Sequence, residues 1–301
     1  MKILITGSNG LLGQKLVKLL VGKDNVEILA TSKGKNRLKN KDQYHYQSLD
    51  ITNREEVFRV IENFQPDTII NTAAITNVDD CESNLEICWN LNVNAVNHLI
   101  EVSDCNDIHL IHLSTDFVFD GENGPYKEDD IPNPLSYYAK SKYAAEKLLQ
   151  SSNIKWSIAR TILVYGVGEN MSRSNIVLLA KEALEKGNPL TIVNDQFRSP
   201  TLAEDLAKGC WLIVKNSAKG IYHISGKDTM SIIELVYKVA DFYGLDKSIV
   251  RSVSSFSLNQ IAKRPLKTGL IIDKAINELN YSSCSFSEGL AILNQQMKAI
   301  D

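Results

Sequence analysis

The sequence has no apolar run near the about 20 residues that a helix needs to cross a bilayer, so we expect no membrane-spanning segment. Its first ten residues, MKILITGSNG, contain too short an apolar run for a signal peptide, because glycines follow at once. A long basic run is also missing, and the formal net charge is −3, which argues against nucleic acid as a partner. The opening run instead predicts a strand that starts the fold.

Cysteines are few and show no paired pattern. No CxxC motif occurs and the number, five, is odd, so we expect reduced thiols in a cytoplasmic protein. Neither a Cys/His spacing nor an acidic cluster supports a metal site, and no metal is expected. The cysteines are Cys81, Cys88, Cys105, Cys210 and Cys284.

Strand-like and helix-like runs alternate as far as Arg160, in a chain of 301 residues that can form one large domain or two unequal ones. This alternation is typical of βαβ units with helices on both faces of a parallel sheet. Right-handed crossovers then favour an α/β fold with a doubly wound parallel Rossmann sheet. The predicted strands are Lys2–Thr6, Val26–Thr31, Thr68–Asn71, Leu110–Ser114 and Trp156–Arg160. The predicted helices between them are Leu11–Leu20, Glu55–Asn63, Glu86–Val102 and Tyr137–Leu149.

The alternation loosens after Arg160, which predicts a smaller, partly discontinuous C-terminal substrate domain that closes over the mouth of the sheet. We expect residues 1–162, with about 198–218, to form the dinucleotide-binding domain. Residues of about 163–197 and 219–301 would form the substrate domain. The predicted elements here are the helices Asn175–Lys186, Leu202–Val214 and Ile232–Tyr243 and the strands Leu190–Val193 and Gly220–Ser225.

A glycine-rich stretch, TGSNGLLG, follows the first predicted strand and opens the first helix. Glycines allow positive φ at the turn and let backbone amides approach a pyrophosphate, which then faces the helix N-terminus. A structural turn with incidental glycines is the alternative, but the strand–turn–helix context favours cofactor binding. The residues expected to contact the cofactor here are Gly7, Asn9, Gly10, Leu11, Leu12 and Gly13.

The second predicted strand ends without the acid that often binds the ribose 2′-hydroxyl of NAD. Ser32, Lys33 and Arg37 offer a hydroxyl and two cations at this place instead. Their charge favours a 2′-phosphate, so we expect NADPH as the cofactor and keep NADH as the alternative. A solvated basic loop is the other interpretation of the stretch KGKNRLKNK.

Tyr138 and Lys142 are four residues apart in the stretch SYYAKSKYAAEK, so a helix places them on one face. Such a pair on an exposed helix is common and usually does nothing. A free phenol has a pKa of ~10 and is a poor acid or base at neutral pH. A lysine ammonium one turn away would lower that pKa and make the tyrosine useful in proton transfer.

The motif STDFVFDG, followed by the Tyr138/Lys142 pair, resembles the dTDP-4-dehydrorhamnose reductases, which are extended short-chain dehydrogenases/reductases. The likeness continues through the glycine loop, NTAA, RTILVYG, NDQFRSPT and KRPLKTGL, and so covers most of the chain. It implies a reductase that transfers a hydride from NADPH to the 4-keto group of a nucleotide-linked deoxysugar. The implied reaction converts dTDP-4-dehydro-L-rhamnose into dTDP-L-rhamnose.

The resemblance also implies roles for individual residues. Tyr138 would be the acid, Lys142 would hold the nicotinamide ribose hydroxyls, and Thr115 would polarise the substrate carbonyl. Asn92 matches a helix asparagine that supports a proton relay through water. Further cofactor contacts are implied for Asp50, Ile51, Thr72, Ala73, Ala74 and Leu113.

Three residues concern the sugar nucleotide. Asp116 is a candidate sugar contact, with a structural turn acid as the alternative. Arg198 stands where the reductase pattern more often has glycine, and its spacing to Asp205 resembles that of nucleotide-sugar epimerases, so we expect it to bind the diphosphate, with a surface arginine as the alternative. Leu163 replaces a tryptophan that usually packs on the sugar, which leaves the sugar identity open.

Two other functions fit the same motifs. The regulatory β subunit of methionine adenosyltransferase resembles these reductases, so a catalytically silent NADP-binding protein is one alternative. An epimerase or dehydratase is the other, although the STDF segment lacks the second acid expected of a dehydratase. A nucleotide sugar is the expected ligand, and a homodimer is compatible with the sequence.

Overall fold

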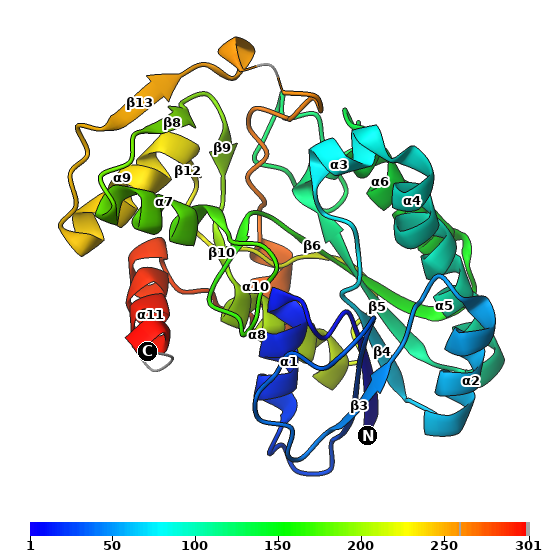
Figure 1. Ribbon diagram of the computed structural model, residues 1–301. Helices are drawn as coiled ribbons and strands as arrows, with labels where there is room; N and C mark the ends of the chain where they lie inside the picture. The colour runs from blue at the N-terminus through cyan, green and yellow to red at the C-terminus, as the bar shows by residue number, and fades with distance from the viewer. Residues whose placement is uncertain (259, 299–301) are drawn as a thin grey trace.

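A seven-stranded parallel sheet forms the centre of the molecule, in the order β11-β6-β5-β4-β1-β2-β3 (Figure 1). The computed structural model describes residues 1–258 and 260–298. The order reverses direction beside β1, as in a doubly wound fold, so the predicted fold class is confirmed. The strands are β1 (Lys2–Thr6), β2 (Glu27–Ser32), β3 (His45–Ser48), β4 (Thr68–Asn71), β5 (His109–Thr115), β6 (Lys155–Thr161) and β11 (Gly220–His223).

Helices cover both faces of this sheet. Those on one face, α1 and α8, pack against each other, and α2, α5 and α6 share a core with the other face (Figure 1). Asn53 caps α2 and Ser136 caps α6 through side-chain oxygens that accept backbone N–H bonds. The helices of this part are α1 (Leu11–Leu20), α2 (Arg54–Phe64), α3 (Val78–Ser83), α4 (Leu85–Trp89), α5 (Ala95–Asn106), α6 (Tyr137–Ser151), α8 (Ala203–Lys215) and α10 (Asp273–Leu279).

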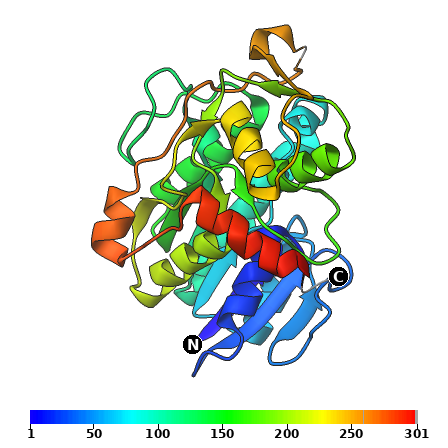
Figure 2. The ribbon, with the colours of Figure 1, turned by 90° about the vertical axis from the view of Figure 1, so that its left-hand side faces the viewer.

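A second, smaller core lies beside the sheet, where α7, α9 and α11 pack with short strands. Figure 2 shows α11 running from this core toward α1, and Lys15 of α1 donates a hydrogen bond of 3.0 Å to Gln296 of α11. The elements are α7 (Ile176–Glu185), α9 (Ile232–Tyr243), α11 (Phe286–Lys298), β7 (Val164–Tyr165), β8 (Leu190–Val193), β9 (Phe197–Arg198), β10 (Thr201–Leu202), β12 (Met230–Ser231) and β13 (Val250–Val253). A short 3₁₀ turn, Ser255–Ser257, follows β13, and another, Asp116–Val118, follows β5 of the central sheet.

The long helix predicted at Glu86–Val102 is one continuous helical run from α4 to α5, with a π-helical turn, η1 (Asn90–Asn94), in its middle. Such turns widen a helix by one residue and are frequent at functional sites. Here the π turn carries Asn92. Among the described residues, no helix is both long and apolar enough to span a bilayer.

The expected division into two domains stays a proposal, with one adjustment. The strand β11 pairs with β6 at the edge of the sheet, although we expected 219–301 in the substrate part. His223 at the end of β11 is fully buried. We therefore propose that β11 and α10, which packs against α8 and β11, belong to the dinucleotide-binding part rather than to the substrate part.

Candidate active site

The glycine loop joins β1 to α1 in a conformation that side chains would block. Gly7 has a φ of +67°, and a Cβ there would lie 2.7 Å from the backbone nitrogen of Ala73. A Cβ on Gly13 would lie 2.5 Å from the Gly7 carbonyl oxygen, so this glycine lets α1 pack against the loop. The loop is therefore a cradle with room for a ligand above it, and its residues fit a dinucleotide pyrophosphate.

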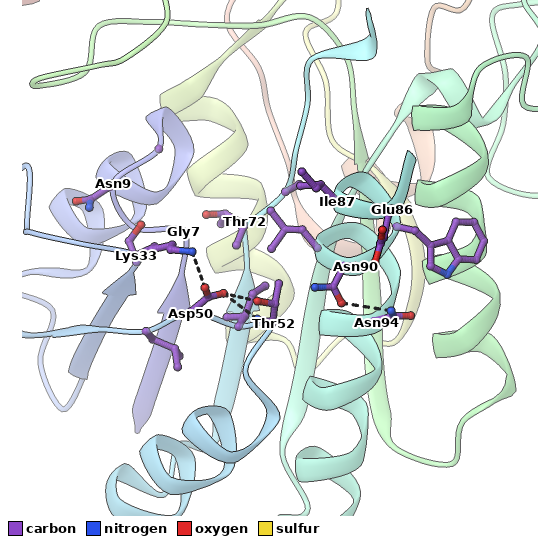
Figure 3. A pocket seen from close by; sticks show the side chains of 18 of the residues that line it. Gly7, Asn9, Lys33, Asp50, Thr52, Thr72, Glu86, Ile87, Asn90 and Asn94 are labelled. Carbon is purple, nitrogen blue, oxygen red and sulfur yellow. Dashed lines mark hydrogen bonds and ion pairs between the residues drawn. The ribbon is translucent and has the colours of Figure 1, made fainter. Parts of the chain in front are cut away.

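A cavity of about 1130 Å³ opens above this loop at the carboxyl ends of β1, β2 and β4 (Figure 3). Its volume suits a dinucleotide. The predicted cofactor contacts that line it are Gly7, Asn9, Gly10, Ser32, Lys33, Arg37, Asp50, Ile51, Thr72, Ala73 and Ala74. The other predicted contacts lie elsewhere: Leu11, Leu12 and Gly13 in the first turn of α1, Leu113 in β5, and Tyr138 and Lys142 in α6.

The basic stretch after β2 forms one wall of this cavity. Asn9 holds it to the glycine loop, since its Nδ2 donates to the Lys35 carbonyl and its Oδ1 accepts from the Arg37 backbone nitrogen. Lys33 pairs with Asp50 at 2.7 Å, as Figure 3 shows. Lys33 and Arg37 thus both line the cavity just after β2, and their binding of a ribose 2′-phosphate stays a prediction.

Residues on the opposite wall escaped the sequence analysis. Side chains of the helical run from α4 into η1 face the glycine loop across the cavity, among them Glu86, Ile87 and Asn90 (Figure 3). Leu85, Ile87 and Trp89 of this helix are large apolar residues that are exposed, but exposure is a property of the folded chain that the sequence alone does not show. The remaining unpredicted lining residues are Leu49, Thr52, Trp89, Leu91, Asn94 and Tyr137.

Glu169, in the loop after β7, is a second residue that sequence reasoning missed. Its side chain accepts a hydrogen bond from the Lys39 backbone nitrogen at 2.7 Å and pairs with Lys18 of α1 at 2.6 Å. Glu169 thereby connects the loop after β7 to the basic stretch after β2 and to α1. A lone glutamate in a loop has no pattern that would have revealed this contact.

The predicted catalytic residues converge near the end of β5. Thr115 ends that strand, and Tyr138 and Lys142 project from the first turns of α6, which packs against it. All three side chains are buried. The four-residue spacing therefore marks a buried helix face beside a strand end, and the solvated-face alternative is wrong.

The protonation of Tyr138 differs from the sequence-based expectation. Burial raises the pKa of this phenol, while hydrogen bonding to Thr115 opposes the shift and the charge of Asp116 adds to it. Lys142 directs its amine to His112, with 2.9 Å between Nζ and Nε2. The expected lowering by Lys142 is therefore wrong for this structure, and the phenol stays protonated at neutral pH.

Asn92 lies in the π turn and is buried. Its Oδ1 accepts a hydrogen bond from the Ile75 backbone nitrogen at 2.9 Å, and its Nδ2 donates to Ser141 Oγ at 3.0 Å. Ser141 in turn donates to the Tyr138 carbonyl. The side chain thus joins the loop after β4 to α6, and its part in a proton relay stays a prediction.

Arg198 and Asp116 are buried together. The Arg198 guanidinium donates to the carbonyls of Phe197, Leu266 and Pro265, at 2.7 to 3.0 Å. Its Nε lies 3.7 Å from Asp116, which also accepts a hydrogen bond from Thr268. These contacts anchor the 265–268 segment to the end of β5. Diphosphate binding by Arg198 and sugar binding by Asp116 stay predictions beside this anchoring role.

Replacing Arg198 by alanine is expected to lower the free energy of unfolding by about 3 kcal/mol or more, because a buried Asp116 would lose its cation. Urea denaturation measures the change. The matched control is Arg251→Ala, an exposed arginine of β13, which should change stability by less than about 0.5 kcal/mol. Wild-type stability together with a raised KM for the sugar nucleotide would contradict the anchoring role and support diphosphate binding.

Comparisons with known proteins extend over nearly the whole chain. A family model described as the RmlD substrate binding domain matches residues 1–299. The chain is 34% identical over 285 residues to a dTDP-4-dehydrorhamnose reductase of Aggregatibacter actinomycetemcomitans, with 91% of each chain covered. It is 30% identical over 258 residues to methionine adenosyltransferase 2 subunit beta of Bos taurus, covering 84% of this chain and 75% of the relative. A crystal structure of dTDP-4-dehydrorhamnose reductase from Bacillus anthracis in complex with NADP matches with a TM-score of 0.83 and 27% identity, covering 98% of this chain and 99% of that one.

Proposed function

The chain belongs to the family described as the RmlD substrate binding domain, and from this membership we infer that it is an NADP-dependent reductase of a nucleotide-linked 4-keto-deoxysugar. The substrate that the resemblance implies is dTDP-4-dehydro-L-rhamnose, and the product is dTDP-L-rhamnose. The observation that carries this conclusion is the convergence of Thr115, Tyr138 and Lys142 at the end of β5, with Tyr137, the neighbour of Tyr138, in the wall of a cavity of dinucleotide size.

The residues present suit the reduction of a ketone. NADPH, when bound in the cavity, supplies the hydride that reaches the carbonyl carbon. Thr115 would donate a hydrogen bond to the carbonyl oxygen and draw charge onto it. Tyr138 would give its phenolic proton to the same oxygen, and its raised pKa keeps that proton in place until the oxygen becomes basic. Lys142 would bind the ribose hydroxyls of the cofactor.

The direct test mixes the purified protein with NADPH and dTDP-4-dehydro-L-rhamnose and follows absorbance at the nicotinamide band. Oxidation that depends on the sugar supports the reductase. A second candidate is a silent cofactor-binding subunit, which the similarity to a methionine adenosyltransferase subunit favours. NADPH binding without consumption, for this and related keto sugars, would support that candidate and contradict the reductase.

Exchanging both Lys33 and Arg37 for alanine is expected to reduce the preference for NADPH over NADH. Each contact to a phosphate is worth about 1.5 kcal/mol, so the loss of two contacts should lower the ratio of kcat/KM values on the order of 100-fold. Steady-state assays with both cofactors measure it. Lys41→Ala, in the same basic stretch but outside the cavity wall, serves as the control. An unchanged ratio in the double variant would show that these side chains are only solvated charges.

We propose a cytoplasmic location, which the free cysteines support, since none of the five forms a disulfide. Assembly as a homodimer is also a proposal, and sedimentation measurements would test it. Neither property enters the reaction described above.

A further inference from the structure

A row of buried polar side chains crosses the sheet and ends on Lys142. Thr6 pairs in register with Asn71 across β1 and β4, and Asn71 pairs with His112 across β4 and β5. Paired residues of adjacent strands point to the same face, so the three side chains meet. The distances are 2.6 Å from Thr6 Oγ1 to Asn71 Oδ1, 3.1 Å from Asn71 Nδ2 to His112 Nδ1, and 2.9 Å from His112 Nε2 to Lys142 Nζ.

Burying this row of polar side chains lowers the stability of the fold unless each polar atom is hydrogen-bonded. Its members are between 0% and 3% exposed, and the preceding residues on the same strands, Ile5, Ile70 and Ile111, show that apolar side chains pack well in this sheet. Burying polar groups costs free energy unless each is hydrogen-bonded, and an apolar replacement of similar shape is often neutral. Stability of the fold alone therefore does not explain why these positions carry polar side chains. The row's only ionisable neighbour with a predicted part in the reaction is Lys142.

We propose that His112 is a positioning residue for Lys142, whose ammonium donates a hydrogen bond to His112 Nε2 while Asn71 fixes the imidazole through Nδ1. This rests on the proposed function, in which Lys142 binds the cofactor ribose. An ammonium has only donors, so Nε2 must accept and the imidazole proton must sit on Nδ1. The Asn71 amide then turns its oxygen toward Nδ1 and its nitrogen toward Thr6, since the two orientations of an amide fill the same space.

The charges around Lys142 explain why this contact matters. Glu146, on the next turn of α6, is paired with Arg160 of β6 at 2.7 Å, and Cys88 of α4 is the other titratable group near the amine. Burial lowers the pKa of Lys142 to about 8, with Glu146 and Cys88 opposing the shift. The ammonium is therefore present below pH 8 and is lost as pH rises through that value. Removing an acceptor from the charged form would lower the pKa further.

The first experiment compares two substitutions at one position. His112→Leu removes the acceptor, so kcat for sugar-dependent NADPH oxidation should fall about 10- to 100-fold, and the alkaline limb of the pH profile should move down by roughly one pH unit. In His112→Gln, an amide oxygen replaces Nε2, and we expect kcat within about threefold of wild type with the alkaline limb restored. The control is His109→Leu, another buried histidine of β5, whose contact is Ser157 and whose loss should leave the limb in place.

The second experiment needs no variant and no sugar. Imidazole ¹⁵N chemical shifts of the wild-type protein at pH 7 distinguish the two neutral tautomers of His112. We expect the proton on Nδ1. A proton on Nε2 would overturn the proposal, because His112 would then donate to Lys142. Identical kcat values and limbs for His112→Leu and wild type would also overturn it.

These measurements separate two kinds of failure. If the wild-type protein binds NADPH but reduces no keto sugar, the proposed function fails, whereas the tautomer still decides the contact between His112 and Lys142. If His112→Leu does not fold, Thr6→Val removes the far end of the row with an isosteric side chain suited to a strand. We expect Thr6→Val to move the alkaline limb in the same direction. If a folded Thr6→Val protein kept the alkaline limb of its pH profile at the wild-type position, this result would contradict the proposal that the row positions Lys142.

Discussion

Tyr138→Phe is expected to reduce kcat for sugar-dependent NADPH oxidation about 10³-fold, in the range typical of lost general acid catalysis. The substitution removes only the phenolic oxygen, and the ring still packs edge-on against Phe117 at 6.0 Å between centroids. The dissociation constant for NADPH should change little, because the residues that line the cofactor cavity are untouched. Stopped assays for kcat and fluorescence titration for NADPH measure the two quantities separately.

Tyr143→Phe is the matched control for this experiment. Tyr143 lies on the same helix, five residues further on, and its ring contacts the Lys147 ammonium rather than the site. The substitution removes only the hydroxyl and leaves the half-buried ring packed against the cluster that contains Val118 and Phe119, so kcat should stay within about twofold of wild type. A Tyr138→Phe enzyme with more than a tenth of wild-type kcat would show that another group delivers the proton.

Gly7→Ala should both weaken NADPH binding at least tenfold and lower the free energy of unfolding by about 3 kcal/mol. Two effects add here, the backbone strain of a positive φ and the steric overlap of the new methyl group. A φ of +67° is unfavourable for alanine, and the new methyl group would lie 2.7 Å from the Ala73 backbone, which cannot move without displacing β4. Urea denaturation and NADPH titration measure the losses of stability and of affinity.

Gly22→Ala separates the backbone strain from the steric overlap. Gly22 has a φ of +80°, and a Cβ there would meet nothing within 4 Å. This control should therefore show only the backbone strain, about 1 kcal/mol, with NADPH affinity unchanged. Equal destabilisation by both substitutions would mean that the close approach of the glycine loop to Ala73 does not matter.

The parts of the site that could be predicted share one property, which is that their signal is local in sequence. The glycine loop follows a buried strand, and the basic stretch follows the next one, so both meet at the carboxyl edge of a parallel sheet. The fold class followed from alternating periodicity for the same reason. Tyr138 and Lys142 were found by their four-residue spacing and by the resemblance of STDFVFDG to the reductases.

What could not be predicted depends on contacts between distant segments. The direction of the Lys142 side chain depends on the register of β4 against β5, which places His112 beneath it. The contacts of Arg198 with Leu266 and Pro265 join segments 67 and 68 residues apart. Burial is the main cause of the raised pKa of Tyr138. It depends on how the whole molecule packs, so a single sequence motif does not reveal it.

The path of the chain through the fold limits how the molecule can be divided. After the first part of the smaller core, the chain returns to the sheet to form α8, which covers α1, and β11, which extends the sheet beyond β6. A fragment that ends at residue 162 would lose both, so the apolar face of α1 would be bare and β6 would become an open edge strand prone to aggregation. We therefore expect that limited proteolysis between the two cores releases no autonomously folded cofactor-binding fragment.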